Sequence, residues 1–577
     1  MIRALLVWGV VAFAVLQVFE PVMHGLHLPE WTLSFVVVVL GLGFPITAAL
    51  AWVFDLKASG IERTPPVVQE GGGSPATSRP PRGRLLLLLG LGIAAAAPGL
   101  VYFFVWPGAG RRPAEVSGAN SAAKGAPSIA VLPFADMSPQ KDQEYFADGI
   151  AEEILNALAQ VDGLRVVGRT SSFAFKARNE DLAGIGQKLH VASVLEGSVR
   201  KEGSRVRINA QLINAADGYH LWSQTFDREL TGVFAVQDEI AKAVTHALAL
   251  KLLPGRAGPA VRPATDPEAY RLYLLARQLT QFGTVEAFDR AIVALRQAAR
   301  VAPNDARVQA QLAFLLWQRA VIGTGDMKKP NAEALAMADQ AVALGPDLPD
   351  VYVVRGLLRH MTTWDWAAAR ADDERALALA PGDVVGRTNF SRLLATTGKL
   401  KEAVETMTRV TEADPLSPNA WLWMGVLQSA SGHPEQGEVS LQRGLDLAPN
   451  HAYLLRELGF ALLLQNRPKE ALAIAERHPV EWMRWLLEAM AQHQLGNDGA
   501  SRQALEHLLK VGAPASYQLA QVHAWRGEKD RAFEWLERGY ETDDSGMRFT
   551  IHDPMIAGLR GDPRYKVLLQ KMNLPVE

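Results

Sequence analysis

The chain has 577 residues and a net charge of −2 at pH 7, so it is long enough for several domains and lacks the basic balance typical of nucleic-acid-binding proteins. It contains no cysteine, which excludes disulfide bonds, thiolate nucleophiles and cysteine-based metal sites. We therefore expect no nucleic-acid partner, and we look for function in the domain organisation.

Three apolar segments near the amino terminus predict transmembrane helices. Residues 33–54 and 85–106 carry no charge, and about 22 residues at 1.5 Å per residue suffice to cross a hydrocarbon core of about 30 Å. Residues 4–19 are shorter and lack an A-x-A cleavage site, so they predict a signal anchor that is not removed. The lipid bilayer is thus an expected partner.

Lysine and arginine in the loops predict the orientation. Residues 20–32 contain neither, whereas residues 55–84 contain five, so the second loop is expected in the cytoplasm. Three spans in a bacterial inner membrane then leave the amino terminus cytoplasmic and residues 107–577 periplasmic. If residues 4–19 do not span, the topology inverts, and Arg111 and Arg112 after the third span conflict mildly with our choice.

Stretches rich in glycine, proline and serine mark the linkers between domains. The resulting organisation is a multidomain chain with the first two transmembrane helices in 1–56, a cytoplasmic linker in 57–84, the third transmembrane helix in 85–106, a linker in 107–127, a small α/β domain in 128–250, a linker in 251–267, and an all-α solenoid with a C-terminal cap in 268–577.

The α/β domain is predicted from alternating strand and helix patterns. Val206 and Ile208 alternate with Arg205 and Arg207, which is typical of a half-buried strand, and Gly203 predicts the turn before it. The expected strands are 128–134, 164–167, 192–200, 206–213 and 219–226, and the expected helices are 150–159, 182–189 and 233–250.

Several strings in this region carry a family resemblance. SIAVLPFADMS, YFADGIAEEI, GRTSSFAFK and VLEGSVRKEG are similar to a bacterial domain that resembles the amino-terminal domain of TolB and the flagellar protein FlgO. The resemblance implies a position between a membrane anchor and helical repeats, with a cytoplasmic cyclase, kinase or DNA-binding domain upstream. Because the chain begins almost at its first predicted span, we expect no such effector within it.

Motifs for catalysis are missing from the sequence. It contains no phosphate-binding loop, zinc-binding helix, nucleophile elbow or kinase set, and Gly184 with Gly186 lacks the third glycine of a dinucleotide site. His24 and His27 lack an acidic cluster nearby, so we interpret them as solvated. We expect no cofactor and no bound metal.

Three polar groups in the α/β domain have alternative interpretations. Asp148 before Gly149 is placed to cap a helix rather than to act in catalysis. The string Arg169 to Ser172 is interpreted as a turn that satisfies its own backbone, with an anion site as the alternative. A third group, formed by Glu196, Ser198 and Arg200 on one strand face, fits either cross-strand pairing or a binding edge.

Prolines at regular intervals identify the repeats. Three successive intervals are about 34 residues, the period of tetratricopeptide repeats, which the chain resembles. The prolines concerned are Pro303, Pro346, Pro381, Pro415 and Pro449. Gly425, Gly437 and Gly444 are expected where helices approach closely, with Trp421 and Leu441 filling the space between helices. We expect about eight units in 268–540, a loop insertion at 323–331, and a cap at 553–574.

The resemblance to tetratricopeptide repeats implies that the first helix of each pair lines a concave face. Basic and amide side chains along such a groove can bind a peptide carboxylate. The candidate partner-binding residues are Arg359, Asn389, Arg392, Trp423 and Arg456. The alternative is a solvated face with Trp423 packed between repeats.

The expected function is that of a non-enzymatic, membrane-anchored scaffold that binds a protein or peptide partner. An alternative is a sensory or regulatory subunit that couples a periplasmic signal to a cytoplasmic cyclase, kinase or transcription factor. A hydrolase in the α/β domain is the third interpretation, and it requires a pocket with clustered titratable groups.

Overall fold

The computed structural model divides the chain into two compact units, Met1–Ala122 and Ala123–Glu577. It describes residues 54–57, 60–63, 127–229 except 177, 179 and 204, 243–248, and 266–576 except 281–283, 323–326 and 511–515. In the first unit, β1 (Phe54–Lys57) and β2 (Gly60–Arg63) form an antiparallel hairpin at the start of the predicted cytoplasmic linker. The three predicted spans lie outside the described residues, apart from Phe54, which begins β1. Among the described residues, no helix combines the length and apolarity that a membrane crossing needs.

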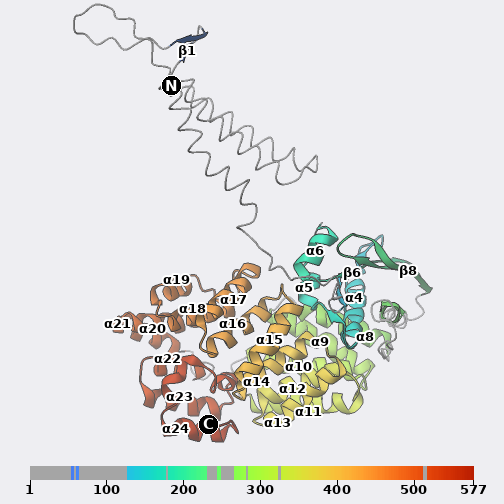
Figure 1. Ribbon diagram of the computed structural model, residues 1–577. Helices are drawn as coiled ribbons and strands as arrows, with labels where there is room; N and C mark the ends of the chain where they lie inside the picture. Colours follow the sequence, from blue (N-terminus) through green and yellow to red (C-terminus); the bar gives the residue numbers. More distant parts are fainter. Residues whose placement is uncertain are drawn as a thin grey trace, which may run out of the picture. The chain divides into compact units, whose positions relative to one another are not determined.

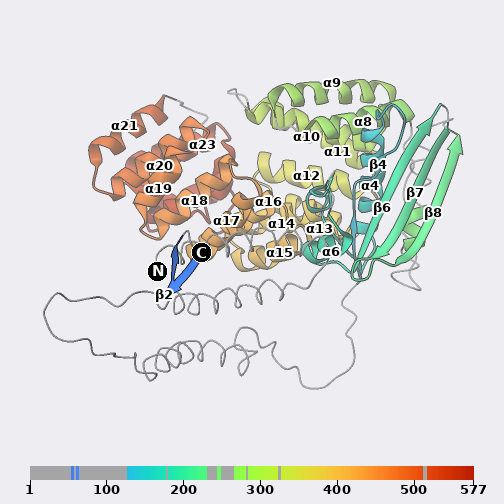
Figure 2. The ribbon, with the colours of Figure 1, turned by 90° about the horizontal axis from the view of Figure 1, so that it is seen from above.

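The α/β domain contains a sheet with the strand order β5-β3-β6-β7-β8, and β4 extends the pairing of β6 (Figure 2). Its strands are β3 (Ser128–Val131), β4 (Ala135–Asp136), β5 (Arg165–Val166), β6 (Ser193–Glu202), β7 (Arg205–Asn214) and β8 (His220–Glu229). The short strands pair in parallel, whereas β6, β7 and β8 form an antiparallel meander. The turn between β6 and β7 contains Gly203 with φ +58°, as predicted.

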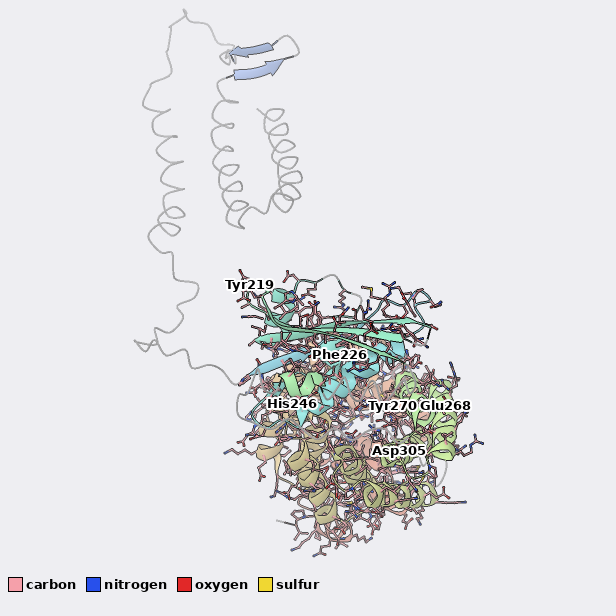
Figure 3. The ribbon with its side chains drawn as sticks, turned by 90° about the vertical axis from the view of Figure 1, so that its right-hand side faces the viewer. Tyr219, Phe226, His246, Glu268, Tyr270 and Asp305 are labelled. Carbon is pink, nitrogen blue, oxygen red and sulfur yellow. The ribbon has the colours of Figure 1, made fainter. Side chains whose placement is uncertain are left out.

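Helices cover one face of this sheet. Phe226 is buried on the side that faces the helices, and Tyr219 is exposed at the end of the sheet (Figure 3). The core of the domain includes Ile150 and Ile154 of α4 (Glu144–Ala159) and Val244 of the helical residues 243–248. The rest of the predicted helix 233–250 lies outside the described residues. On the open face the pairing is polar, because Asn209 of β7 lies between Ser198 of β6 and Thr225 of β8.

The predicted cap of the first helix of this domain is wrong. Helix α4 begins six residues before the predicted start, so Asp148 lies inside it and accepts a hydrogen bond of 2.6 Å from Lys176 Nζ. The helix α6 (Leu182–Leu189) has the predicted bounds, and the Asp181 side chain caps it by accepting from the Gly184 backbone N–H. Gly184 and Gly186 are therefore helix residues.

The rest of the second unit, after the α/β domain, is a stack of helical pairs (Figure 1). This is the tetratricopeptide architecture expected from the sequence. Eight pairs are described between Pro267 and Glu541, and their first helices alternate with their second helices along the chain. The pairs are α8 (Pro267–Thr280) with α9 (Val285–Val301), α10 (Ala306–Ile322) with α11 (Lys328–Leu344), α12 (Pro349–Thr362) with α13 (Trp366–Leu379), α14 (Val384–Thr396) with α15 (Leu400–Ala413), α16 (Pro418–Ala430) with α17 (Pro434–Leu447), α18 (Ala452–Leu464) with α19 (Pro468–Glu476), α20 (Glu481–Gln494) with α21 (Asp498–Leu509), and α22 (Ser516–Trp525) with α23 (Lys529–Glu541).

The five marker prolines end helices by one repeated geometry. Each lies two residues after its helix, and the residue before it has φ between −129° and −142°, because proline disfavours the helical conformation there. Four of the prolines also accept a hydrogen bond at their carbonyl from the side chain six residues later. The donors are Gln309 Nε2, Tyr352 OH, Arg387 Nη2 and Trp421 Nε1.

Small residues set the distance between paired helices, as predicted. A Cβ atom at Gly425 would lie 2.5 Å from Leu441 Cγ and 3.0 Å from the Gly437 carbonyl oxygen. A Cβ atom at Gly444 would lie 2.6 Å from Leu454 Cδ2 of the next repeat. The turn between the two helices of this pair needs a left-handed residue, which Gly432 supplies at φ +84°.

The α/β domain packs directly on the repeats. The string at 169–172 forms a short helix, α5 (Arg169–Phe173), and the Ser171 backbone N–H donates to Asp414 Oδ1 at 2.8 Å. The Leu416 N–H donates to Ser171 Oγ at 2.8 Å, and the Gly168 N–H donates to the Ala413 carbonyl at 2.8 Å. The prediction of a turn that satisfies only its own backbone is thus wrong, because its donor binds a carboxylate of the repeats.

A second contact joins α4 to the first repeat helix. Tyr270 OH donates to Glu153 Oε1 at 2.7 Å, and Arg277 Nη2 lies 3.0 Å from Glu152 Oε2. Glu152 also pairs with Arg169. Figure 3 shows Tyr270 on the helical side of the domain, near Glu268. The α/β domain and the repeats therefore share a polar interface.

The chain ends in η2 (Ser545–Phe549), η3 (Pro554–Leu559) and α24 (Pro563–Lys571), and we call residues 543–574 the C-terminal segment. Ile556 and Leu568 belong to one hydrophobic cluster with Phe533 of α23, so the C-terminal segment covers the last pair. The same cluster includes Trp366 of α13 and Leu393 of α14. The cap therefore also reaches the middle of the stack (Figure 1).

The predicted insertion loop is partly helical. Helix α11 begins at Lys328, so the last residues of 323–331 belong to it, and 323–326 lie outside the described residues. Asn331 is buried, and its Nδ2 donates to Asp543 Oδ2 of the C-terminal segment at 2.6 Å. This contact fixes the start of the helix against a part of the chain far away in sequence.

Candidate functional site

The C-terminal segment lies on the first helices of the middle repeats, and we call the side of α12, α14 and α16 that it contacts the inner face. A small cavity at this contact is lined by residues of the inner face and of the C-terminal segment. The inner face supplies His360, Met361, Arg392, Ala395, Thr396, Trp423 and Leu427, and the C-terminal segment supplies Arg548, Phe549 and His552. Two of the predicted site residues, Arg392 and Trp423, thus face the chain's own terminus.

Arg392 and Trp423 are in direct contact. The guanidinium carbon of Arg392 lies 4.3 Å from the centroid of the Trp423 ring, and Arg392 Nη2 lies 3.7 Å from Met361 Sδ. On the segment side, Phe549 stacks with Trp423 at 5.9 Å between ring centroids and 10° between planes. Burial, only partly offset by Asp373, lowers the pKa of Arg392 to about 10.

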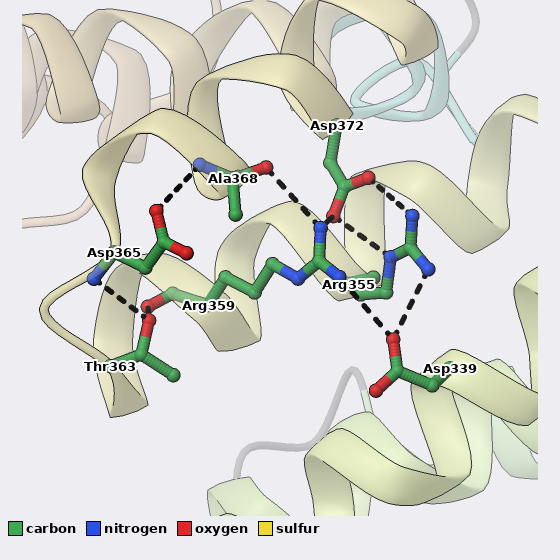
Figure 4. A network of polar contacts seen from close by, with 7 residues as sticks. All are labelled: Asp339, Arg355, Arg359, Thr363, Asp365, Ala368 and Asp372. Carbon is green, nitrogen blue, oxygen red and sulfur yellow. Dashed lines mark hydrogen bonds and ion pairs between the residues drawn. The ribbon is translucent and has the colours of Figure 1, made fainter.

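Arg359 lies elsewhere, between α11 and α13 (Figure 4). Its Nη1 donates to Asp372 Oδ2 at 2.9 Å, and its Nη2 lies 3.4 Å from Asp339 Oδ1. Arg355 binds the same two carboxylates, at 2.6 Å to Asp372 Oδ1 and 3.1 Å to Asp339 Oδ1. The structure therefore does not place Arg359 beside Arg392, because these carboxylates hold it between the neighbouring second helices of two repeats.

Asn389 and Arg456 occupy different surroundings. Asn389 is buried in α14, and its Nδ2 has no hydrogen-bond partner among the described residues. Arg456 of α18 pairs with Glu457 at 2.5 Å and lies 5.1 Å from the ring centroid of Tyr453. Its charge also acts on Asp553, so it lies near the C-terminal segment.

Two buried histidines complete this contact. Burial and the charges of Arg392 and Arg548 lower the pKa of His360 well below its ordinary value. Burial lowers the pKa of His552 to about 4, and a hydrogen bond with the Ala395 backbone opposes this shift. Both rings are thus neutral at neutral pH, and the Nδ1 of each has no partner among the described residues.

The sequence analysis missed the contribution of the C-terminal segment because the predicted cap began at residue 553. Arg548 has a 2% exposed side chain, and its Nη2 lies 2.8 Å from Asp543 Oδ1. Its guanidinium carbon lies 4.0 Å from the Trp364 ring centroid. An available signal was the mixture of basic, aromatic and apolar residues in the string GMRFTIH, which begins at Gly546, shortly after the last helical pair.

The described residues show no group of three or more acidic or histidine side chains placed to hold a metal ion. The open sheet face pairs polar residues across strands, as at Asn209 and Thr225. The arrangement at the inner face is suited to holding a polypeptide segment.

Comparisons with known proteins find similarities to parts of this chain. Residues 124–243 match the family described as "HilA/YgeH-like transcriptional regulator, second domain". The protein named "Putative adenylate cyclase 3" of Rhizobium meliloti (strain 1021) is 39% identical over 219 residues, which are 37% of this chain and 37% of that protein. The chain thus spans well under two thirds of this relative.

Several solved structures are similar to part of the chain at low sequence identity. Human IFIT1, solved as a dimer with m7Gppp-AAAA, is 14% identical with a TM-score of 0.36 and covers 52% of this chain and 77% of its own. The protein pilF of Pseudomonas aeruginosa is 15% identical with a TM-score of 0.31, covering 38% and 97%. A tetratricopeptide repeat protein from Parabacteroides merdae is 13% identical with a TM-score of 0.34, covering 46% and 99%.

Proposed function

We propose that the chain is a membrane-anchored scaffold that binds a segment of a protein partner at the inner face of its repeats. The observation that supports this best is the C-terminal segment, a polypeptide already seated there. Beside the inner face, at the start of α13, Trp366 Nε1 donates to the Met572 carbonyl at 2.8 Å, and Asn573 Nδ2 donates to the Trp364 carbonyl at 3.2 Å. Together with the stacking of Phe549 on Trp423, these contacts are the kind that a partner segment with an aromatic residue would make.

The proposed point of entry is α18, next to the covered part of the inner face. Tyr453 is 50% exposed there, and Arg456 lies against its ring. Of the five predicted site residues, Arg456 makes the first contact with the partner. Arg392 and Trp423 contact the partner after the C-terminal segment has moved aside.

Photo-crosslinking in native membranes tests this site. A photoreactive residue at Tyr453 is compared with one at Val439, which is 57% exposed on the second helix α17. We expect one crosslinked protein from position 453, none from position 439, and a higher yield at 453 when Phe549→Ala weakens the segment contact. Equal yields from both positions would contradict the proposal. So would crosslinks obtained only from a third photoreactive residue, placed at Thr225 on the open sheet face.

A second candidate function is a regulatory subunit for an effector carried by another chain. Two observations favour it: the match of residues 124–243 to a family described as a transcriptional regulator domain, with the partial similarity of the chain to a protein named as a putative adenylate cyclase, and the hydrogen bonds that join the α/β domain to the repeats at Ser171 and Asp414. Through such an interface, binding of a ligand to the repeats can change the conformation of the α/β domain, which follows the predicted third span. Crosslinking and mass spectrometry of purified membranes would distinguish the candidates, because a cyclase, kinase or transcription factor favours regulation and a periplasmic protein favours the scaffold.

A further inference from the structure

The strand β8 forms one edge of the sheet, and β7 is its only partner among the described residues (Figure 2). It has ten residues, whereas β5 at the opposite edge has two. The backbone N–H and C=O groups along the outer side of an edge strand can pair with a further strand. In the described part of the sheet, β8 therefore offers a long pairing edge and β5 a very short one.

Strand β8 lacks the features by which proteins usually protect such an edge. It contains no proline or glycine, and its shift of register against β7, which skips Leu221, lies near its start. The side chains at its centre, Ser223, Gln224 and Thr225, are exposed and uncharged. A second strand can therefore approach the centre of β8 without meeting charge repulsion or a distorted backbone.

The acidic side chain near the end of β8 is directed over its own sheet. Asp227 Oδ2 accepts a hydrogen bond of 2.7 Å from Arg207 Nη2, and Asp227 Oδ1 accepts one of 3.0 Å from Arg205 Nη2. Both arginines belong to β7, so the carboxylate lies toward the strand that is already paired. Its negative charge is balanced there and does not guard the outer edge of β8.

Two copies of β8 are complementary when they run antiparallel with Thr225 at the centre. Thr225 then faces Thr225 of the second copy, while Ser223 faces Asp227 and the half-buried Trp222 faces Arg228. These pairs join two hydroxyls, a hydroxyl and a carboxylate, and an indole ring and a guanidinium, and each is a favourable cross-strand pair. The twofold symmetry forms the last two pairs twice.

A register shifted along the strand loses this match. Moving the centre to Gln224 would place the apolar Leu221 opposite Asp227. It would also place Trp222 opposite Phe226, whose ring is buried in the core of its own domain. The first register also continues the polar row of the open face, in which the central threonine already donates to a β7 asparagine at 2.8 Å. The side chains therefore favour pairing about the threonine.

We propose that β8 pairs in antiparallel orientation with β8 of a second copy of this chain, with Thr225 on the twofold axis. The two sheets then form one continuous sheet whose open polar faces lie on the same side. An unrelated extended peptide would make the same backbone hydrogen bonds without the matched side-chain pairs, so the second copy is the better occupant. This edge is separate from the inner face of the repeats, and self-association there does not depend on partner binding.

Single cysteines test the pairing, because the chain has no cysteine of its own. The full chain in native membranes is oxidised mildly, and a disulfide-linked product of twice the chain's mass is measured. We expect this product from Thr225→Cys, since the two side chains face each other across about 5 Å. Asn209→Cys on β7 is the matched control, because its two copies would lie about 14 Å apart. Equal yields from these two variants would overturn the proposal.

A pair of variants tests the register. Ser223→Cys alone should give no such product, since position 223 of the second copy lies about 13 Å further along the strand. Expressed together with Asp227→Cys it should give the product, because positions 223 and 227 face each other. A product from Ser223→Cys alone that exceeds the mixed product would contradict pairing about Thr225.

Light scattering of the purified full chain in detergent measures self-association without cysteines. We expect a dimer for the unaltered chain and a shift toward monomer in Thr225→Lys, which places two positive charges opposite each other. Asn209→Lys, one strand further from the edge, should remain a dimer. A monomeric unaltered chain, or a dimer that persists equally in Thr225→Lys, would overturn the proposal.

Discussion

Gly425 lies where α16 and α17 meet, and its missing side chain lets Leu441 and the Gly437 carbonyl approach the helix backbone. This is a packing constraint that acts at one position, because a neighbour must shift before any side chain fits. Gly499, in the first turn of α21, is also helical but would place a Cβ atom with nothing within 4 Å. The two glycines form a matched pair for measuring the effect of close helix approach.

We predict that Gly425→Leu lowers the free energy of unfolding by about 1 to 3 kcal/mol, because the added side chain overpacks the contact with Leu441. The same substitution at Gly499 should leave stability unchanged or raise it by up to about 1 kcal/mol, since leucine is a better helix former than glycine. Denaturant unfolding of the full chain measures both. Equal midpoints for the two variants would refute the packing argument.

The His552 ring predicts a pH dependence of stability. Its pKa in the folded chain is about 4, against an ordinary value of 6.5, so between these values the unfolded chain binds more protons. Stability from this ring is therefore present above about pH 6.5 and is lost as the pH falls toward 4, and the difference between pH 7.5 and pH 5 is about 2 kcal/mol. Unfolding of His552→Gln at both pH values isolates the effect, because the variant should lose less stability than the unaltered chain. Parallel losses would show that His552 titrates normally in the folded state.

At the scale of elements, α5 depends on a carboxylate from the repeats. Asp414 accepts from the backbone N–H of Ser171 near the start of this short helix, and Thr170 also hydrogen-bonds to it. It thus acts as a helix cap supplied by another domain. The aspartate Asp383 caps α14 through the backbone N–H groups of Val385 and Gly386, entirely within the repeats.

We predict that Asp414→Ala destabilises the chain by about 1 to 3 kcal/mol and loosens the α/β domain, because it leaves buried donors without an acceptor. Asp383→Ala should cost a similar amount without affecting α5. Hydrogen exchange at residues 169–173 distinguishes the two, since it should speed up only in Asp414→Ala. Exchange that is equally fast in both variants would mean that the interface does not hold α5.

Local patterns predicted the elements whose determinants lie nearby in the sequence. The prolines predicted helix ends because each acts on the residue directly before it, and α6 was predicted with the correct bounds because Asp181 caps it. The start of α4 was missed because Asp148 followed by Gly149 resembles a cap, although the side chain pairs with Lys176 instead. The role of the string at 169–172 could not be predicted, since its partner Asp414 is more than 240 positions away.

In the candidate site, too, features set by nearby residues were predicted and contacts between distant residues were not. The repeat pattern placed Arg392 and Trp423 correctly on first helices, but not the segment that covers them, because contacts such as Trp366 to Met572 join residues 206 positions apart. Arg359 was assigned to the groove by its helix alone. Its actual direction depends on Asp339 and Asp372 in two other helices.

For the whole molecule, the charges of the loops predict the membrane topology. The absence of lysine and arginine in residues 20–32 and the five in residues 55–84 predict that residues after 107 are periplasmic. Alkaline phosphatase fused after Leu250 should therefore be active, and β-galactosidase at the same point should be inactive. The reverse pair of results would require the inverted orientation.

The seating of residues 543–574 on α12 to α16 has a consequence for the order of events during synthesis. The covering residues leave the ribosome last, about 10 to 40 seconds after His360 at typical elongation rates of 5 to 20 residues per second. From the time each is made until the segment arrives, Trp423 and Arg392 belong to an uncovered surface, open to chaperones and to any partner made nearby. A nascent chain stalled before Met547 should therefore bind ligands that the completed chain does not bind.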